Sequence, residues 1–126
     1  RGAQLVLSAR REEELERVRA GLVNSEAHLV LPLDLANSDA MEAAVEQVRQ
    51  TCGRLDQVVH NGGISQRSLV ADTDLSVDRQ ILEVNFFGTV AVTKAVLPWF
   101  KAQGGVRSGY SCDAGDAGFY SYPGVH

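Results

Sequence analysis

The chain has 126 residues, a formal net charge of -4 and 44% apolar residues. This length is enough for one domain with a single core, although it is short for a sheet that helices cover on both faces. Acidic residues are spread along the chain, so we expect no nucleic acid partner. Cys52 and Cys112 are far apart and lack metal-ligand spacing, which predicts a reducing compartment, no disulfide framework and no metal site.

Strand and helix patterns alternate from the start of the chain. Residues 5–7 form a short apolar run, and Leu15, Val18 and Leu22 follow at helical spacing behind three glutamates. A second apolar run covers residues 28–33. The helix predicted after it has an apolar face made of Met41, Ala44, Val45 and Val48.

The third unit starts with an apolar run at residues 55–59 and continues into a long helical pattern. The inner face of this helix is predicted to consist of Val77, Ile81, Val84, Gly88, Ala91 and Ala95. Three strand–helix units predict an α/β fold with a doubly wound parallel sheet and right-handed crossovers.

Neither a targeting segment nor a membrane span is expected. The most apolar stretch, residues 89–100, contains Lys94 and Pro98 and is too short to cross a bilayer. No signal peptide precedes the first predicted strand.

The composition changes near Gly104, where glycines become frequent and no apolar run is long enough for a buried strand. We therefore expect an α/β domain over residues 1–103 and an irregular, glycine-rich tail over residues 104–126.

Polar residues and glycines follow each predicted strand, where the ligands of open parallel sheets bind. Two guanidiniums can grip a phosphate, a carboxylate can accept from an exocyclic amine, and glycines let a ligand approach the backbone. Each cluster alone also fits an ordinary helix start or turn. Together they predict a nucleotide site made of Arg10, Arg11, Asp34, Leu35, Asn61, Gly62 and Gly63.

The order of these clusters resembles the short-chain dehydrogenase/reductase family over residues 4–103. The resemblance rests on Ser-Ala-Arg-Arg at 8–11, Leu-Asp-Leu at 33–35, Asn-Gly-Gly at 61–63, Val-Asn-Phe-Phe-Gly at 84–88 and Leu-Pro at 97–98. It implies part of a Rossmann-like domain that binds a nicotinamide cofactor and acts on a carbonyl or alcohol substrate.

The resemblance also implies roles for single residues. Asp34 would meet the adenine with the backbone of Leu35, and residues 61–63 would flank the adenine ribose. His60 replaces an asparagine of the family pattern, and we favour a structural role for it over that of a general base. Asn85 matches the asparagine that holds a water in the family's proton relay, although a mid-helix amide can also bond a neighbouring carbonyl.

Arginine at position 10 predicts the cofactor. An acidic residue at this strand end would bond the 2′-hydroxyl of NAD, whereas an arginine suits the extra phosphate of NADP. NADP is therefore the expected cofactor. Residues 61–69 further resemble a subgroup tied to endoplasmic reticulum membranes, which predicts that location.

The catalytic residues implied by the family are incomplete. Tyr110, in Ser-Gly-Tyr-Ser, is the candidate proton donor, but Ala114 stands where a lysine should lower its pKa. No lysine follows Lys101, and Leu97 occupies the place of the expected serine, 13 residues before the tyrosine.

Two strands of the family sheet are expected to be missing. The first, with its glycine-rich turn, would precede residue 1, and the fifth would be reduced to residues 104–107. We therefore expect an inactive fragment of an oxidoreductase whose open strand edges either pair directly or drive association. The alternative is a non-catalytic relative that binds a nucleotide or dimerises through the long helix at residues 76–101.

Overall fold

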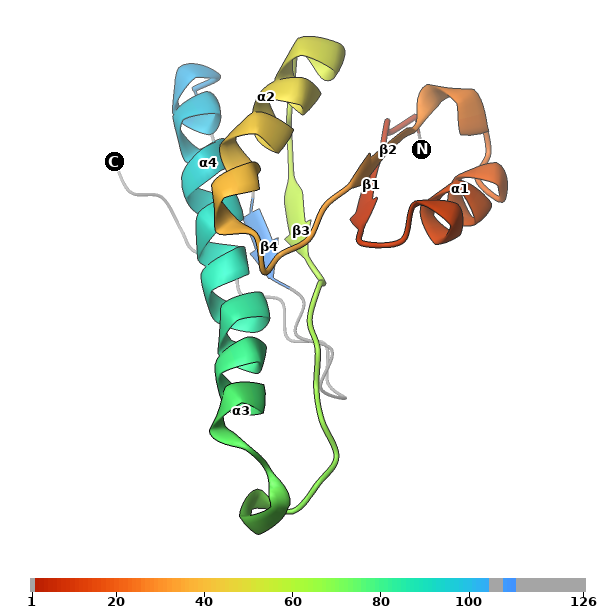
Figure 1. Ribbon diagram of the computed structural model, residues 1–126. Helices are drawn as coiled ribbons and strands as arrows, with labels where there is room; N and C mark the ends of the chain where they lie inside the picture. Colours follow the sequence, from red (N-terminus) through yellow and green to blue (C-terminus); the bar gives the residue numbers. More distant parts are fainter. Residues whose placement is uncertain (1, 105–107, 111–126) are drawn as a thin grey trace.

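The computed structural model describes residues 2–104 and 108–110. It contains four β-strands, four α-helices, three 3-10 turns (η1 to η3) and one π-helical segment (η4), shown in Figure 1. In chain order they are β1 (Val6–Ala9), α1 (Glu12–Ala20), η1 (Ser25–Ala27), β2 (Leu29–Pro32), η2 (Ser38–Ala40), α2 (Met41–Cys52), β3 (Val58–His60), η3 (Val70–Asp72), α3 (Leu75–Leu82), η4 (Glu83–Gly88), α4 (Thr89–Ala102) and β4 (Ser108–Tyr110).

All three predicted strand–helix units are present, so the α/β prediction is confirmed. The first two strands pair in parallel, with Val6 opposite Leu29 and Ala9 opposite Pro32. β2 ends at Pro32, which has no N–H to donate. α1 packs on β1 and β2 and lies on the side of this strand pair away from α2 and α4, as Figure 1 shows.

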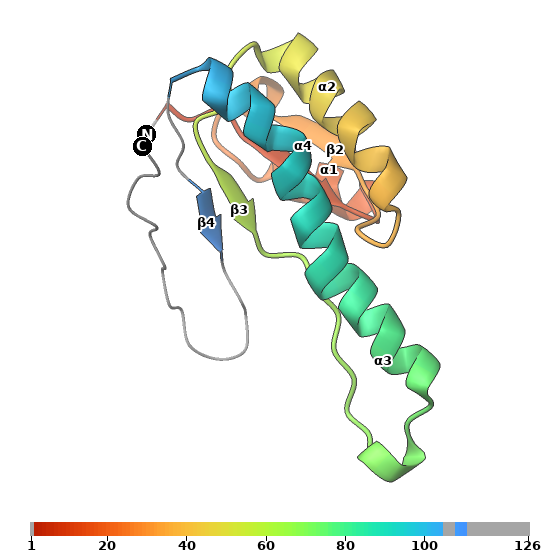
Figure 2. The same cartoon turned by 90° about the vertical axis from the view of Figure 1, so that its left-hand side faces the viewer.

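The core lies between α2 and α4, which pack side by side in both views (Figures 1 and 2). Met41 at the start of α2 and Phe100 near the end of α4 are each 1% exposed. The other buried apolar side chains among the described residues are Leu15, Ala44, Val48, Val84, Val96 and Trp99. The predicted apolar face of α2 is thus confirmed at Met41, Ala44 and Val48.

The prediction that the whole tail is irregular and that no strand follows the long helix is wrong at three residues. Ser108–Tyr110 forms β4, which pairs in parallel with β3 and places Tyr110 opposite His60. The segment contains a glycine and no apolar run, and ladder hydrogen bonds come from the backbone, so hydropathy gave no signal for it. Residues 105–107 and 111–126, including Ala114, lie outside the described part.

In the described residues, β1 and β3 do not pair with each other. The strands form two separate two-stranded sheets, β1 with β2 and β3 with β4. Of the two alternatives expected for the open edges, direct pairing of the two strands is therefore wrong, and association through the edges stays a prediction. One edge of β1 and one edge of β3 remain without a strand neighbour in the described residues.

The long helix extends well beyond residues 89–100, the apolar stretch that was judged too short to cross a bilayer. α3, η4 and α4 follow one another without a break from Leu75 to Ala102, 28 residues, and α3 projects away from the rest of the molecule in Figure 2. By length and composition alone this helix could cross a bilayer, so the expectation of no such segment is corrected. The same property is found in helices that cover a sheet, and α4 packs on α2.

Candidate functional site

The carboxyl ends of β1 and β2 bring the first two polar clusters to one edge of their sheet. The parallel register continues one step past the strands, because Leu33 N–H donates to the Ala9 carbonyl at 3.0 Å. Arg10 and Asp34, the next residues on each strand, therefore leave the sheet at the same edge.

Arg10 and Arg11 are both exposed, and Arg11 is the residue that precedes α1. Within the described part of the chain, neither guanidinium has a carboxylate within 4 Å. By contrast, Arg17 and Arg19 on α1 pair with glutamates three residues earlier. The two arginines at the strand end are thus available to an anionic ligand.

Asp34 forms the turn that follows β2. Its Oδ1 accepts from the Ala36 N–H at 3.0 Å, and its carbonyl accepts from the Asn37 N–H at 3.0 Å. The side chain thereby folds the loop back on itself in the manner of an Asx turn. A residue predicted to contact adenine thus also holds its own loop in place.

Leu35 joins this loop to the rest of the site. A Cβ at Gly62 would lie 2.6 Å from Leu35 Cδ1, and a Cβ at Gly88 would lie 2.5 Å from the Leu35 carbonyl oxygen. Real Cβ atoms do not approach so closely, so Gly88, which meets backbone atoms, requires glycine, whereas a Cβ at Gly62 would force the end of the Leu35 side chain to shift. The loop after β2, the turn after β3 and η4 therefore meet at Leu35. The sequence placed Gly88 on the inner helix face, but its close contact with a loop carbonyl needed the tertiary structure.

Asn85 connects η4 to the turn after β3. Its Oδ1 accepts from the Ile64 N–H and its Nδ2 donates to the Ile64 carbonyl, both at 2.8 Å. A Cβ at Gly63 would lie 3.3 Å from Asn85 Oδ1, so the glycine also gives the amide room. Asn85 sits in a π-helical segment, a geometry frequent at functional sites. The contact between Asn85 and the turn after β3 was not predicted from the sequence, and the proton-relay role of Asn85 stays a prediction.

His60, the last residue of β3, bonds across to the long helix. The Thr93 hydroxyl donates its proton to the Thr89 carbonyl at 2.8 Å, so it accepts from His60 Nε2 at 3.2 Å. Burial lowers the pKa of His60 below its ordinary value, which favours the neutral ring. This contact fits the structural role that we favoured for His60.

Tyr110 is the last residue of β4, and its backbone is in register with that of His60. It thus belongs to a strand beside the site. Its predicted role as proton donor stays a prediction, as do the predicted contacts of the cofactor residues.

A hollow of about 410 Å³ lies along the long helix. It is lined by Asn85, Phe86, Thr89, Val90, Thr93 and Lys94. Phe86 and Phe87 are 57% and 52% exposed and pack edge to face, with ring centroids 5.2 Å apart. Among the described residues, no cluster of histidine, cysteine, aspartate or glutamate could hold a metal ion.

Comparison with known proteins agrees with this geometry. The family model described as short chain dehydrogenase matches residues 1–111. The chain belongs to the short-chain dehydrogenase family. The family predicted from the strand-end motifs is therefore confirmed.

Among curated members of the short-chain dehydrogenase family, dehydrogenase/reductase SDR family member 7 from Homo sapiens is 52% identical over 102 residues. The protein of the same name from Mus musculus is 49% identical over 102 residues. The aligned part makes up 77% of this chain but 30% of each relative, so the chain spans less than a third of their length.

Solved short-chain dehydrogenases show the same architecture. One from Streptomyces avermitilis is 25% identical with a TM-score of 0.77, covering 86% of this chain and 39% of the other. The 3-ketoacyl-(acyl-carrier-protein) reductase from Brucella melitensis, complexed with NADH, is 28% identical with a TM-score of 0.75, covering 82% of this chain and 42% of the other. The partial Rossmann-like fold expected for this family is thus confirmed.

Proposed function

We propose that this chain is the middle part of an NADP-dependent oxidoreductase that acts on a carbonyl or alcohol substrate. The observation that carries the proposal is the pair of exposed guanidiniums, Arg10 and Arg11, at the carboxyl end of β1, which have no carboxylate partner among the described residues. Membership in the short-chain dehydrogenase family supports the reaction class.

The residues at the strand ends fit the adenosine half of such a cofactor. Arg10, with Arg11, would pair with the 2′-phosphate, because guanidinium and phosphate form charge-assisted hydrogen bonds. Asp34 and Leu35 would border the adenine, and the bare backbone of residues 61–63 would face the ribose. When bound, the cofactor would supply or accept the hydride. Residues 1–103 are thus proposed as the cofactor-binding region.

We propose that the chain by itself has no catalytic activity. A tyrosine has a pKa of about 10, and a nearby cation must lower it before the side chain can exchange protons at neutral pH. The sequence has no lysine after Lys101, and Ala114 stands four residues after Tyr110. Asn85 would retain its place in the relay, held by Ile64.

The hollow on the long helix favours a second candidate function, a non-catalytic relative that dimerises. Phe86, which lines the hollow, and its neighbour Phe87 expose apolar rings, and Leu82 is 57% exposed on the preceding turn. Phe86→Asp would convert a dimer through residues 76–101 to a monomer in light-scattering measurements. Val23→Asp, at an exposed position before η1, is the matched control.

A location at endoplasmic reticulum membranes is part of the proposal and rests on the likeness to family member 7.

The cofactor proposal is tested by calorimetry on the chain fused to a family strand and glycine-rich turn placed before Arg1. NADPH should bind more tightly than NADH. Arg10→Ala should weaken NADPH by roughly tenfold or more, the effect of losing a charge-assisted pair worth about 1.5–3 kcal/mol, and leave NADH nearly unchanged. Arg49→Ala on α2 is the control, because its guanidinium lies far along the chain beside Glu46. Equal weakening of both cofactors by Arg10→Ala would show that this arginine is only a solvated residue.

A further inference from the structure

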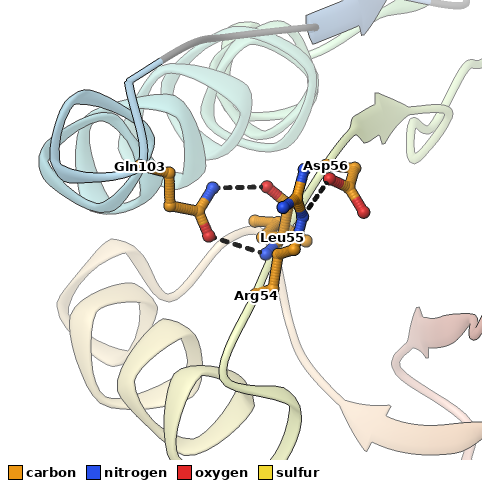
Figure 3. Close-up of polar contacts among 4 residues, drawn as sticks. All are labelled: Arg54, Leu55, Asp56 and Gln103. Atoms are coloured by element: carbon orange, nitrogen blue, oxygen red, sulfur yellow. Dashed lines mark hydrogen bonds and ion pairs between the residues drawn. The ribbon is translucent and has the colours of Figure 1, made fainter.

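Gln103, the residue that follows α4, bonds Leu55, and neither residue belongs to the predicted site. Gln103 Oε1 accepts from the Leu55 N–H at 3.0 Å, and Gln103 Nε2 donates to the Leu55 carbonyl at 2.7 Å (Figure 3). One amide side chain thus satisfies both backbone groups of one residue. The neighbours of Leu55, Arg54 and Asp56, form an exposed ion pair with each other.

The same pattern occurs in η4, within the same long helix. Asn85 bonds both backbone groups of Ile64, and Thr93 bonds His60 between the two amides. Helix positions 85, 93 and 103 therefore meet chain positions 64, 60 and 55. The long helix therefore runs antiparallel to residues 55–64, called here the β3 segment. Polar bonds join the helix to this segment at both ends of the segment and near its middle.

The two segments are matched in length. From Asn85 to Gln103 there are 18 helical steps of 1.5 Å, about 27 Å. From Leu55 to Ile64, a segment that includes β3, there are nine steps, which span at most about 30 Å when fully extended at about 3.3 Å per residue. Because a hydrogen bond weakens steeply when its donor and acceptor move apart, both amides can bond only in one axial position of the helix.

We infer that Gln103 is a positioning residue that fixes the long helix along β3 and thereby holds Asn85 against Ile64. The buried rings of Trp99 and Phe100 also attach this end of α4. Apolar contacts, however, are non-directional and leave sliding along the helix axis less restricted than hydrogen bonds do. The inference does not depend on the proposed chemistry, since it concerns the placement of a helix that requires no cofactor.

Backbone amide hydrogen exchange on the isotope-labelled chain tests the inference. Gln103→Leu keeps the size of the side chain and removes both bonds. We expect the Leu55 N–H, and also the distant Ile64 N–H, to exchange roughly three- to tenfold faster, the change that corresponds to about one net hydrogen bond. Gln50→Leu on α2 is the matched control, because within the described residues Gln50 bonds the Glu46 side chain and no backbone group of the β3 segment, and it should change neither rate.

Gln103→Glu adds a readout that a space-filling role would not move. At neutral pH a carboxylate can accept from the Leu55 N–H but cannot donate to the Leu55 carbonyl. When it is protonated, below a pH of about 4.3, it regains a donor. The measured quantity is the Ile64 exchange rate in Gln103→Glu divided by the rate in the unmodified chain at the same pH. This ratio should therefore fall towards one on acidification. With Gln103→Leu, the ratio should stay constant.

Two results would overturn the inference. The first is faster exchange at Leu55 with no change at Ile64, which would make Gln103 a local end contact. The second is an Ile64 ratio in Gln103→Glu that does not recover on acidification. If Gln103→Leu speeds exchange throughout α2 because it loosens the whole chain, the pH dependence of the Ile64 ratio in Gln103→Glu still tests the inference.

Discussion

Gly88 in η4 lies directly against the backbone of Leu35 in the loop after β2. A Cβ at Gly88 would stand 2.5 Å from the Leu35 carbonyl oxygen and 2.8 Å from the Leu35 Cβ. The φ of Gly88 is -59°, so its backbone conformation would suit any residue. Glycine is needed here for the close approach of the helix to the loop, and this contact brings two parts of the candidate site together.

Gly88→Ala should therefore lower the free energy of unfolding by about 1–3 kcal/mol, because the added methyl group meets backbone atoms that cannot rotate away. Urea denaturation followed by circular dichroism measures the change. Gly21→Ala is the control, since a Cβ there would make an ordinary contact at 3.5 Å and should change stability by no more than about 0.5 kcal/mol. Equal midpoints for the two variants would contradict the argument.

Asn85→Ala should destabilise the turn after β3. It leaves the Ile64 N–H and carbonyl without their partners, and each net hydrogen bond is worth about 0.5–1.5 kcal/mol. Because two such bonds are lost, denaturation of the variant should show a decrease of about 1–3 kcal/mol in the free energy of unfolding. Asn37→Ala is the comparison, because the Asn37 side chain makes no capping hydrogen bond. A loss no larger than that of Asn37→Ala would show that water replaces the Asn85 amide at no net cost.

The free energy of unfolding should decrease as the pH is lowered through the range in which His60 titrates. Burial lowers the pKa of His60, so the folded chain binds this proton less readily than the unfolded chain does, whose pKa is about 6.5. Above that pH both states are neutral and stability is unaffected. As the pH falls below about 6.5 towards the lower folded pKa, protonation of the unfolded state reduces the free energy of unfolding. Midpoints measured from pH 7.5 to 5 should drop less in His60→Asn, and identical profiles would refute the role of His60.

The purified chain should associate through its open strand edges. β1 and β3 each have one edge without a strand neighbour among the described residues, and exposed edges pair readily with other chains. Size-exclusion chromatography should show an apparent mass that rises with concentration. Fusion of a family strand before Arg1 should reduce this association. A monomer that unfolds cooperatively above about 50 °C, as ordinary mesophile domains do, would be the opposite result.

Turnover is expected to be absent. The chain mixed with NADPH and a panel of ketones and aldehydes should oxidise the cofactor no faster than a protein-free control, because no lysine follows Tyr110 to lower its pKa. Absorbance at the NADPH band measures this. Sustained oxidation that disappears in Tyr110→Phe would prove the chain active and the tyrosine catalytic.

Local patterns predicted much of the fold because periodicity reports burial directly. The apolar positions from Val77 to Ala95 predicted the inner face of the long helix, and all six of them are buried or half-buried. The same reasoning failed at Val18, which is 51% exposed although it shares helical spacing with the buried Leu15. Periodicity identifies a candidate face, but the neighbouring elements decide how much of that face is covered.

The sequence by itself determined the family, the strand–helix order and the residues at the strand ends, because each depends on residue types at short spacing. Only the tertiary structure placed β4 beside β3, Gly88 against Leu35, and the amides of Asn85 and Gln103 on Ile64 and Leu55. Each of these contacts has as at least one partner a backbone group, which every residue type has. Their partners are therefore decided by how the chain brings distant segments together, and residue identity along the chain does not reveal them.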